Sequence, residues 1–149
     1  MKRSQLSSFL LLLFASLIIV SCSKKEDPEP SLADQVAGNY TATSLGFSGI
    51  SVPLPFTDPA DGVTISGKIE IKKVTDDTVD GKLILIYKEP TGQPEEDPAD
   101  LKGISLKKAT NGDIEAYAGT TKIGTYANNE LKLSIDDADL GVVTITGKK

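Results

Sequence analysis

Acidic side chains are the most abundant groups that could do chemistry in this chain of 149 residues, which has 21 Asp and Glu, one Cys and no His. Carboxylates can bind Ca²⁺, or act in pairs as the acid and base of glycoside hydrolysis. None of the acidic groups has the spacing of an EF-hand, Asp is common in turns, and no Trp is present to stack on a sugar. We therefore expect these groups to be turn and surface residues. They are Asp76, Asp77 and Asp80; Glu95, Glu96 and Asp97; and Asp136, Asp137 and Asp139.

Other catalytic and metal-binding chemistries lack their side chains. A nucleophile needs a neighbouring base, and the chain has neither His nor a Gly-x-Ser-x-Gly elbow. Zinc and copper sites are built mainly from His and Cys ligands. We therefore expect no enzymatic activity, no cofactor and no metal site.

The single cysteine, Cys22, stands where a hydrophobic segment ends. Lys2 and Arg3 precede a run of twelve apolar residues, Phe9 to Val20, which is typical of a signal peptide and short for a membrane span. Ile19-Val20-Ser21-Cys22 resembles the lipobox of bacterial lipoproteins. The resemblance implies cleavage before Cys22 and attachment of palmitate-type acyl chains to it, which would anchor the chain to a membrane. An unlipidated secretory signal and an uncleaved anchor are the alternatives.

A short charged segment follows the cysteine. Lys25, Glu26 and Asp27 resemble the surface-export signal of some Gram-negative lipoproteins, which implies an outer-membrane protein displayed on the cell surface. Acidic tethers are also common, so a plain polar tether is the alternative. We expect a signal peptide over residues 1–21, a lipidated tether over 22–30 and one folded domain over 31–149.

The charge of the mature chain limits its partners. Cleavage before Cys22 would leave 14 Lys against 21 acidic residues, a net charge of −7, with no Arg. Nucleic-acid binding needs a basic surface, so no nucleic-acid partner is expected. The charge also disfavours contact between the domain and an anionic membrane surface.

The domain is predicted to be all-β. One helical turn is expected at Ser31–Gly38, and Val63–Lys72 alternates apolar and polar residues with a period of two. Asn111-Gly112 and Asn128-Asn129 predict hairpin turns, and Glu89–Asp100 reads as a solvated loop. No helical crossover is predicted between strands, which favours an antiparallel meander. The eight expected strands are 39–46, 63–72, 81–88, 101–109, 114–119, 122–127, 131–135 and 142–146.

The helical turn, the following Gly38-Asn39-Tyr40 and the eight meander strands resemble the lipocalin and calycin-like barrels. Lipocalins have Gly-x-Trp at this point, so Tyr40 would take the place of the Trp at the closed end of the barrel. The conserved Arg and the C-terminal helix of lipocalins have no counterpart here. The resemblance implies an eight-stranded antiparallel barrel, lipocalin-like; an antiparallel β-sandwich is the alternative.

Residues 46–62 interrupt the strand pattern with an apolar segment. Ile50, Val52, Leu54 and Phe56 share one side of an extended chain, and two prolines share the other. The prolines allow the segment to pair on one side at most. It is either a lid over the open mouth of the barrel or a loop packed on the outside.

Two hypotheses on function follow. The first is a membrane-tethered lipoprotein that holds a small apolar or amphipathic ligand inside the barrel, because a barrel of eight strands is just wide enough for one. The second is a protein-interaction module, either an accessory of a surface complex or an inhibitor of a hydrolase. Under the first hypothesis the ligand-binding residues are Tyr40, Ile50, Val52, Leu54, Phe56 and Tyr87.

Overall fold

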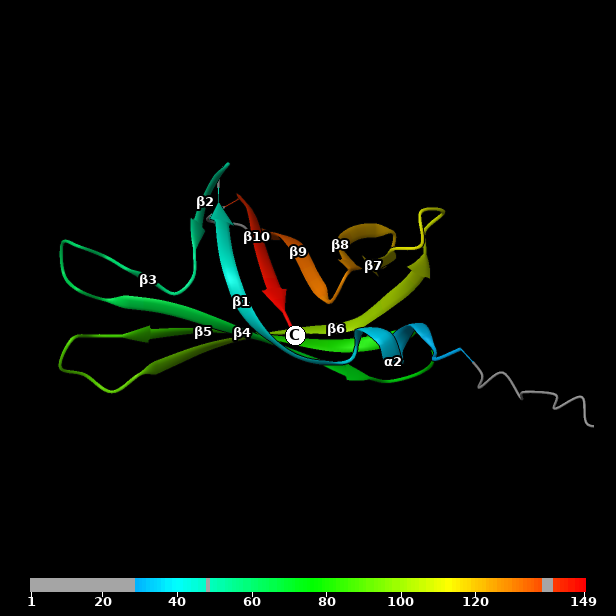
Figure 1. The fold of residues 1–149 in the computed structure, drawn as a ribbon, viewed down its shortest axis with the longest axis horizontal. Coiled ribbons are helices and arrows are strands. Elements are labelled where there is room, and N and C mark those ends of the chain that lie inside the picture. Colours follow the sequence, from blue (N-terminus) through cyan, green and yellow to red (C-terminus); the bar gives the residue numbers. More distant parts are fainter. Residues whose placement is uncertain (1–28, 48, 138–140) are drawn as a thin grey trace, which may run out of the picture.

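A computed structural model describes residues 29–47, 49–137 and 141–149 (Figure 1). The predicted signal peptide, Cys22, and the export residues Lys25, Glu26 and Asp27 lie outside the described residues. The described chain begins with α2 (Leu32–Val36), whose first turn is capped by the hydroxyl of Ser31, which accepts a hydrogen bond from the Asp34 amide. The helix ends earlier than predicted, and Gly38 is already the first residue of β1.

Eight antiparallel strands form a closed barrel, as predicted, and the sandwich alternative is wrong. Consecutive strands from β4 to β10 pair with one another, and β1 completes the ring by pairing with β10 on one side and with β4, over Gly38–Thr41 and Lys68–Ile71, on the other. Closure removes the edges that an open sheet would expose. The barrel strands are β1 (Gly38–Phe47), β4 (Thr64–Lys73), β5 (Thr78–Lys88), β6 (Glu95–Lys108), β7 (Ile114–Ala118), β8 (Thr121–Ala127), β9 (Glu130–Asp137) and β10 (Gly141–Lys148).

The alternation of side chains along the strands creates the core. On β4 the side chain of Ile69 is fully buried and that of Ile71 nearly so, whereas Lys68 and Lys72 on either side of the pair are exposed. The period of two places every second residue inside the barrel. The buried interior residues of the other strands include Ile104, Leu106, Leu131, Leu133 and Ile145.

The meander places alternate connections at opposite ends of the barrel. The turns after β4, β6 and β8 lie at one end, which we call the closed end because α2 covers it. Ala33 and Val36 of α2 are buried there, and the Ala33 amide donates to the carbonyl of Asp76 in the turn after β4. The connections after β1, β5 and β7 lie at the other end, the open end. The β5–β6 hairpin protrudes there, on the side of the molecule opposite α2 (Figure 1).

The turn residues explain two of the connections at the closed end. Asn128 and Asn129 have φ angles of 52° and 62°, which suit the two central residues of a tight hairpin and which Asn tolerates. Gly112 has a φ of 91°, a conformation that favours glycine. Both hairpins predicted from the sequence are therefore confirmed.

The prediction of a solvated loop over Glu89–Asp100 is wrong for its second half. β6 begins at Glu95, and residues Glu95–Asp100 pair with β5 from Tyr87 to Lys82. Their polar side chains are exposed, so composition alone indicated a loop, but the backbone hydrogen bonds extend the ribbon beyond β7. This protruding stretch carries acidic side chains and Pro98. Charged residues and proline at a strand edge hinder pairing with another chain.

Candidate interaction site

The residues predicted to bind a ligand do not come together in one cavity. Tyr40 is buried at the closed end, next to α2. Leu54 is buried in the core cluster, and Phe56 is half-buried against it. Ile50 and Tyr87 are exposed, with 63% and 37% of their surface accessible.

Tyr40 holds the closed end together. Its hydroxyl donates to the carbonyl of Val36 in α2, and its ring packs edge-to-face on Tyr126 with the centroids 6.3 Å apart. The Lys149 ammonium lies 5.3 Å from the centroids of both rings and donates to the Gln35 carbonyl at 2.7 Å. Burial raises the pKa of Tyr40 and lowers that of Lys149. Sequence reasoning missed Lys149, because nothing in the local pattern separates it from an ordinary surface lysine.

The described residues 49–62 of the apolar segment fill the seam where β1 and β4 diverge. Its two short strands, β2 (Ile50–Pro53) and β3 (Phe56–Thr57), pair with β1 and β4 respectively. Between them the Leu54 amide donates to the Thr43 carbonyl at 2.9 Å. Leu54 and Phe56 point into the core, while Ile50 lies at the exposed tip, so the segment is part of the wall and neither of the two predicted arrangements describes it fully.

The inside of the described barrel is filled by its own side chains. Eighteen apolar side chains, nearly all of them from the inner face or α2, are at most 9% accessible. The hollows of the described part of the chain are lined mainly by residues of the outer faces and the ends of the barrel, and one of them, of about 340 Å³, also reaches the buried Tyr40. The interior therefore resembles a packed protein core.

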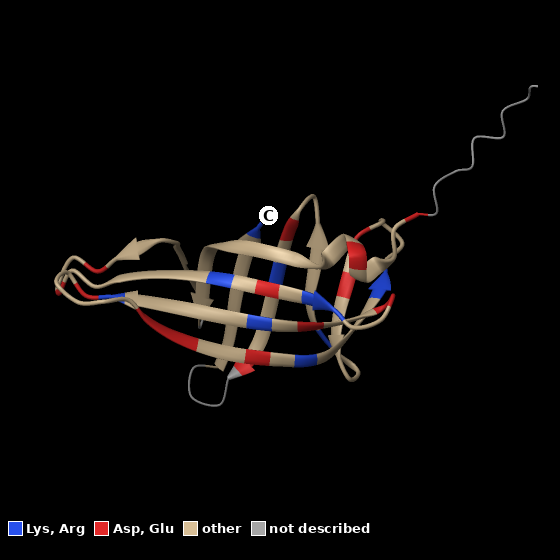
Figure 2. Ribbon diagram, turned by 90° about the horizontal axis from the view of Figure 1, so that it is seen from below, with Lys and Arg blue, Asp and Glu red and all other residues tan. Residues whose placement is uncertain are grey.

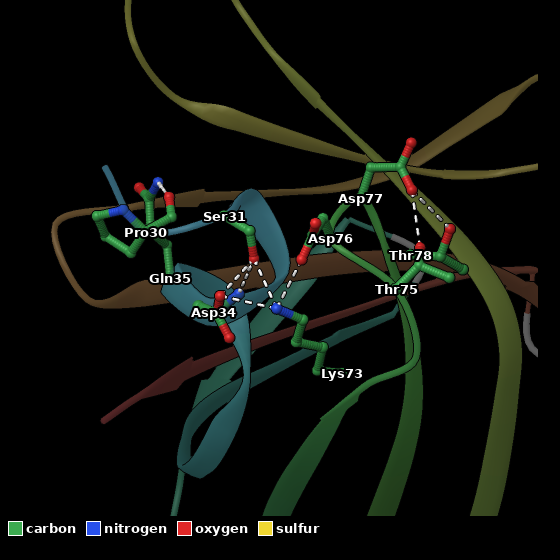
Figure 3. A network of polar contacts seen from close by, with 9 residues as sticks. All are labelled: Pro30, Ser31, Asp34, Gln35, Lys73, Thr75, Asp76, Asp77 and Thr78. Atoms are coloured by element: carbon green, nitrogen blue, oxygen red, sulfur yellow. Dashed lines mark hydrogen bonds and ion pairs between the residues drawn. The ribbon is translucent and has the colours of Figure 1, made fainter. Parts of the chain in front are cut away.

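The acidic residues near α2 have structural partners (Figure 3). Lys73 binds Asp34 and Asp76, both at 2.8 Å, and joins α2 to the turn after β4. The hydrogen bond from Lys73, and then that from Ser31, holds the pKa of Asp34 below its usual value. Asp77 accepts hydrogen bonds from Thr75 and Thr78, which lower its pKa.

Asp80 and Glu96 also take part in local structure. The Gly103 amide donates to Asp80 at 3.0 Å, at a bulge in β6, and this bond lowers the pKa of Asp80, with a further contribution from Lys102. Glu96 pairs with Lys68 across β5. Within the described ranges, no cluster of three potential metal ligands and no helix long and apolar enough to cross a membrane is found.

The outer surface of β4, β5 and β6 carries alternating charges (Figure 2). Across the three strands, Glu70 faces Lys82, which faces Asp100. In the next row the signs are reversed: Lys72 faces Asp80, which forms an ion pair with Lys102 at the bulge in β6. Opposite charges on neighbouring strands stabilise the sheet and leave little net charge. This surface has the character of a solvated outer face.

The outer surface of β2, β1, β10 and β9 is different between the Lys148–Glu130 ion pair at the closed end and Asp136 at the open end, and we call this part the charge-poor face. Its paired rows run from Ser51 through Gly46 and Thr144 to Ser134, and from Ser44 through Thr146 to Lys132. A shallow hollow of about 670 Å³ lies on it, above the position where Gly46 has no side chain. Among the residues that line the hollow, Lys132 is the one with a charge.

Exposed apolar side chains border this hollow. Phe47, Ile50 and Val142, which we call the apolar rim, are 39%, 63% and 53% accessible, and all three line the hollow. They are three of the five large apolar side chains that are exposed in the described residues. Phe47 pairs with Ile50 and Val143 in the row that continues the inner face from Leu45, whereas Val142 faces Asp136 in the outer row, so the three side chains border the hollow from both faces of the sheet. Exposed apolar side chains around a hollow with few charges are typical of a binding site for another molecule. Sequence reasoning identified Ile50 but not Phe47 or Val142, because both belong to ordinary strand patterns.

Comparisons of the chain with protein-family models, curated proteins and solved structures gave no significant match. The site must therefore be interpreted from its own geometry.

Proposed function

We propose that this protein is a non-catalytic lipoprotein, anchored to the outer membrane through acyl chains on Cys22 and displayed at the cell surface, whose barrel is a protein-interaction module. The observation that carries the interaction role is the apolar rim around the hollow of the charge-poor face. A stable monomer gains nothing from exposing large apolar side chains around one hollow, whereas a docking surface does.

The packed interior supports this choice over a ligand inside the barrel. A small-molecule site normally encloses a cavity of roughly 300–1,000 Å³ that buries most of the ligand. The described inner face is filled by aliphatic side chains and by Leu54 and Phe56, and the larger hollows lie outside. The outer hollow is shallow and open, which suits a protruding side chain of a protein partner better than an enclosed small molecule.

The lipid anchor and the interaction role are tested separately. Intact-mass measurement of the membrane-extracted protein should show acyl chains on a chain that begins at Cys22, and Cys22→Ala should move the protein out of the membrane fraction. A mature chain without acyl mass would contradict the anchor.

Native mass spectrometry of the gently extracted protein tests the interaction role. We expect the mass of the acylated chain alone, or with a bound protein. A co-purifying small molecule that survives Ile50→Asp on the rim would instead support the hypothesis of a ligand inside the barrel.

A further inference from the structure

Lys149 turns its side chain over the closed end of the barrel. Its amide donates to the Asn129 carbonyl at 3.2 Å, which continues the pairing of β10 with β9 by one residue. Because side chains alternate along a strand, Lys149 follows the inward direction of Gly147, whereas Lys148 between them is exposed on the outer side. Gly38 leaves room for the stem, since a Cβ at that position would lie 3.0 Å from the Lys149 Cε atom.

Two tyrosine rings and one carbonyl group surround the ammonium group of Lys149. The planes of the Tyr40 and Tyr126 rings are 86° apart, and the Nζ atom lies 5.3 Å from each ring centroid. A cation within about 6 Å of an aromatic ring is attracted by the negative charge of the ring face. The Nζ atom also donates to the Gln35 carbonyl at 2.7 Å, a length typical of a charged donor.

No acidic side chain accounts for this position of the ammonium group. None of the ion pairs found among residues 29–47, 49–137 and 141–149 involves Lys149. Burial lowers the pKa of Lys149, so the charged form loses hydration that the rings and the carbonyl must replace. Lys148 behaves as an ordinary surface lysine by contrast, because it pairs with Glu130 on the outer face.

The ammonium group links elements that are distant in the chain. Tyr40 belongs to β1, Tyr126 to β8 and Gln35 to α2, and Lys149 follows β10. α2 has only five residues. Helices of fewer than about 12 residues are marginal in water on their own. The position of α2 therefore depends on its contacts with the barrel, and the bond from Lys149 to Gln35 is one in which the donor carries a full charge.

We propose that the rings of Tyr40 and Tyr126 and the Gln35 carbonyl form a binding site for a primary alkylammonium group, which Lys149 fills from within the chain, and that the bound ammonium holds α2 on the barrel. Such a group meets each feature of the site. Its charge faces the rings, its N–H groups reach the carbonyl, and its unbranched stem passes Gly38. Lys149 is thus a positioning residue for α2. The site includes no residue of the apolar rim and does not require the lipid anchor, so it goes beyond the proposed function.

Hydrogen exchange of the full acylated chain in detergent tests the role of the charge. Lys149→Met keeps an unbranched stem and removes the ammonium group, and Lys148→Met is the matched control on the outer face. The readout is the protection of the α2 amides, which include those of Ala33, Gln35 and Ala37. We expect Lys149→Met to lower this protection about tenfold, because it removes two cation–π contacts and one charged hydrogen bond. Lys148→Met should change it less than about twofold, since exposed ion pairs contribute little.

Chemical rescue tests whether the site binds a separate ligand. Lys149→Ala removes the three terminal carbons and the nitrogen of the side chain, and propylammonium supplies the same atoms. With an affinity on the order of 10–100 mM for so small a ligand, propylammonium at about 200 mM should restore protection of α2 by about three- to twentyfold over an equal concentration of sodium chloride. 1-Propanol lacks the charge and propyltrimethylammonium lacks the N–H groups, so both should restore clearly less.

The contrary results are distinct. Wild-type protection in Lys149→Met would show that the stem holds α2 and that the charge does not. Equal rescue by 1-propanol would make the site an apolar gap, and a loss in Lys149→Met without rescue by propylammonium would leave a structural contact and no binding site. If Lys149→Ala is unfolded, far-ultraviolet circular dichroism replaces the exchange readout: propylammonium should refold the chain, and refolding by neither or by both compounds would overturn the proposal.

Discussion

Removing the hydroxyl of Tyr40 tests the account of the closed end. Tyr40→Phe keeps the ring, its edge-to-face contact with Tyr126 and the nearby Lys149 ammonium. It removes the hydrogen bond to the Val36 carbonyl, which joins β1 to the end of α2. The substitution therefore isolates one polar interaction in a site where the side chain is 1% accessible.

The expected loss at neutral pH follows from that bond. A buried hydrogen bond that is deleted from one side leaves its partner unpaired, which costs about 1–2 kcal/mol. Tyr87→Phe removes the same atom from an exposed side chain, and we expect it to change the free energy of unfolding by less than about 0.5 kcal/mol.

The difference between wild type and Tyr40→Phe should shrink at alkaline pH. Burial, and then the neighbouring Tyr126, raise the pKa of Tyr40 in the folded protein. Above the unfolded value of about 10, the unfolded chain ionises Tyr40 while the folded chain does not, so the wild type loses about 1.4 kcal/mol per pH unit through this residue. Phe cannot ionise, so the two proteins should become equally stable near pH ~11.

Urea unfolding followed by far-ultraviolet circular dichroism, at intervals from pH 7 to 11, measures both effects. The reasoning predicts two stability curves that converge as the pH passes 10. Curves that stay parallel to pH 11 would mean that the Tyr40 hydroxyl ionises in the folded barrel and is therefore hydrated. No loss at neutral pH would mean that the bond to Val36 contributes nothing to α2 docking.

Three further predictions concern the wall, the seam and the export segment. Gly124→Ala would place a Cβ 2.5 Å from the Lys132 carbonyl oxygen and 2.8 Å from a Leu133 methyl carbon, so the strands must move. Chemical denaturation should show that the free energy of unfolding falls by about 1–3 kcal/mol. The fall should be smaller for the control Gly46→Ala, whose Cβ would come no closer than 3.3 Å to a neighbour. Phe56→Ala should cost about 2 kcal/mol, below the value for a fully buried Phe because the side chain is half-buried; a loss above about 4 kcal/mol would show that the seam is a full part of the core. Replacing Lys25, Glu26 and Asp27 together with Ala should preserve the acyl mass and lower the fraction of protein that external protease removes from intact cells; unchanged proteolysis would leave these residues as a plain tether.

The sequence alone predicted the elements that are specified by residues close together in the chain. The alternation in Val63–Lys72 predicted β4 to within one residue at each end, because each side of a strand meets a uniformly apolar or aqueous environment. Asn128-Asn129 predicted its hairpin because Asn tolerates positive φ angles. Ser31 predicted the start of α2 because its hydroxyl reaches the amide of Asp34 within the same turn.

Local signals failed where the pairing partner decided the structure. Glu95–Asp100 is polar and contains a proline, yet it forms a strand because β5 offers it a free edge. The apolar segment from Ile50 to Phe56 read as a lid or a loop, but its position depends on the gap between β1 and β4, which no local pattern reveals.

The sequence by itself determined the eight strands, the side of each strand that faces inward, the absence of His from any site, and the lipobox-like cysteine. The tertiary structure alone decided that β1 meets β4 across some 30 intervening residues, that side chains fill the interior, that Lys149 lies over Tyr40, and that Phe47, Ile50 and Val142 surround one hollow. Strand periodicity is set by neighbouring residues and is therefore visible in the sequence. Contacts between distant residues depend on register and closure, where a shift of one residue would turn every side chain to the other face.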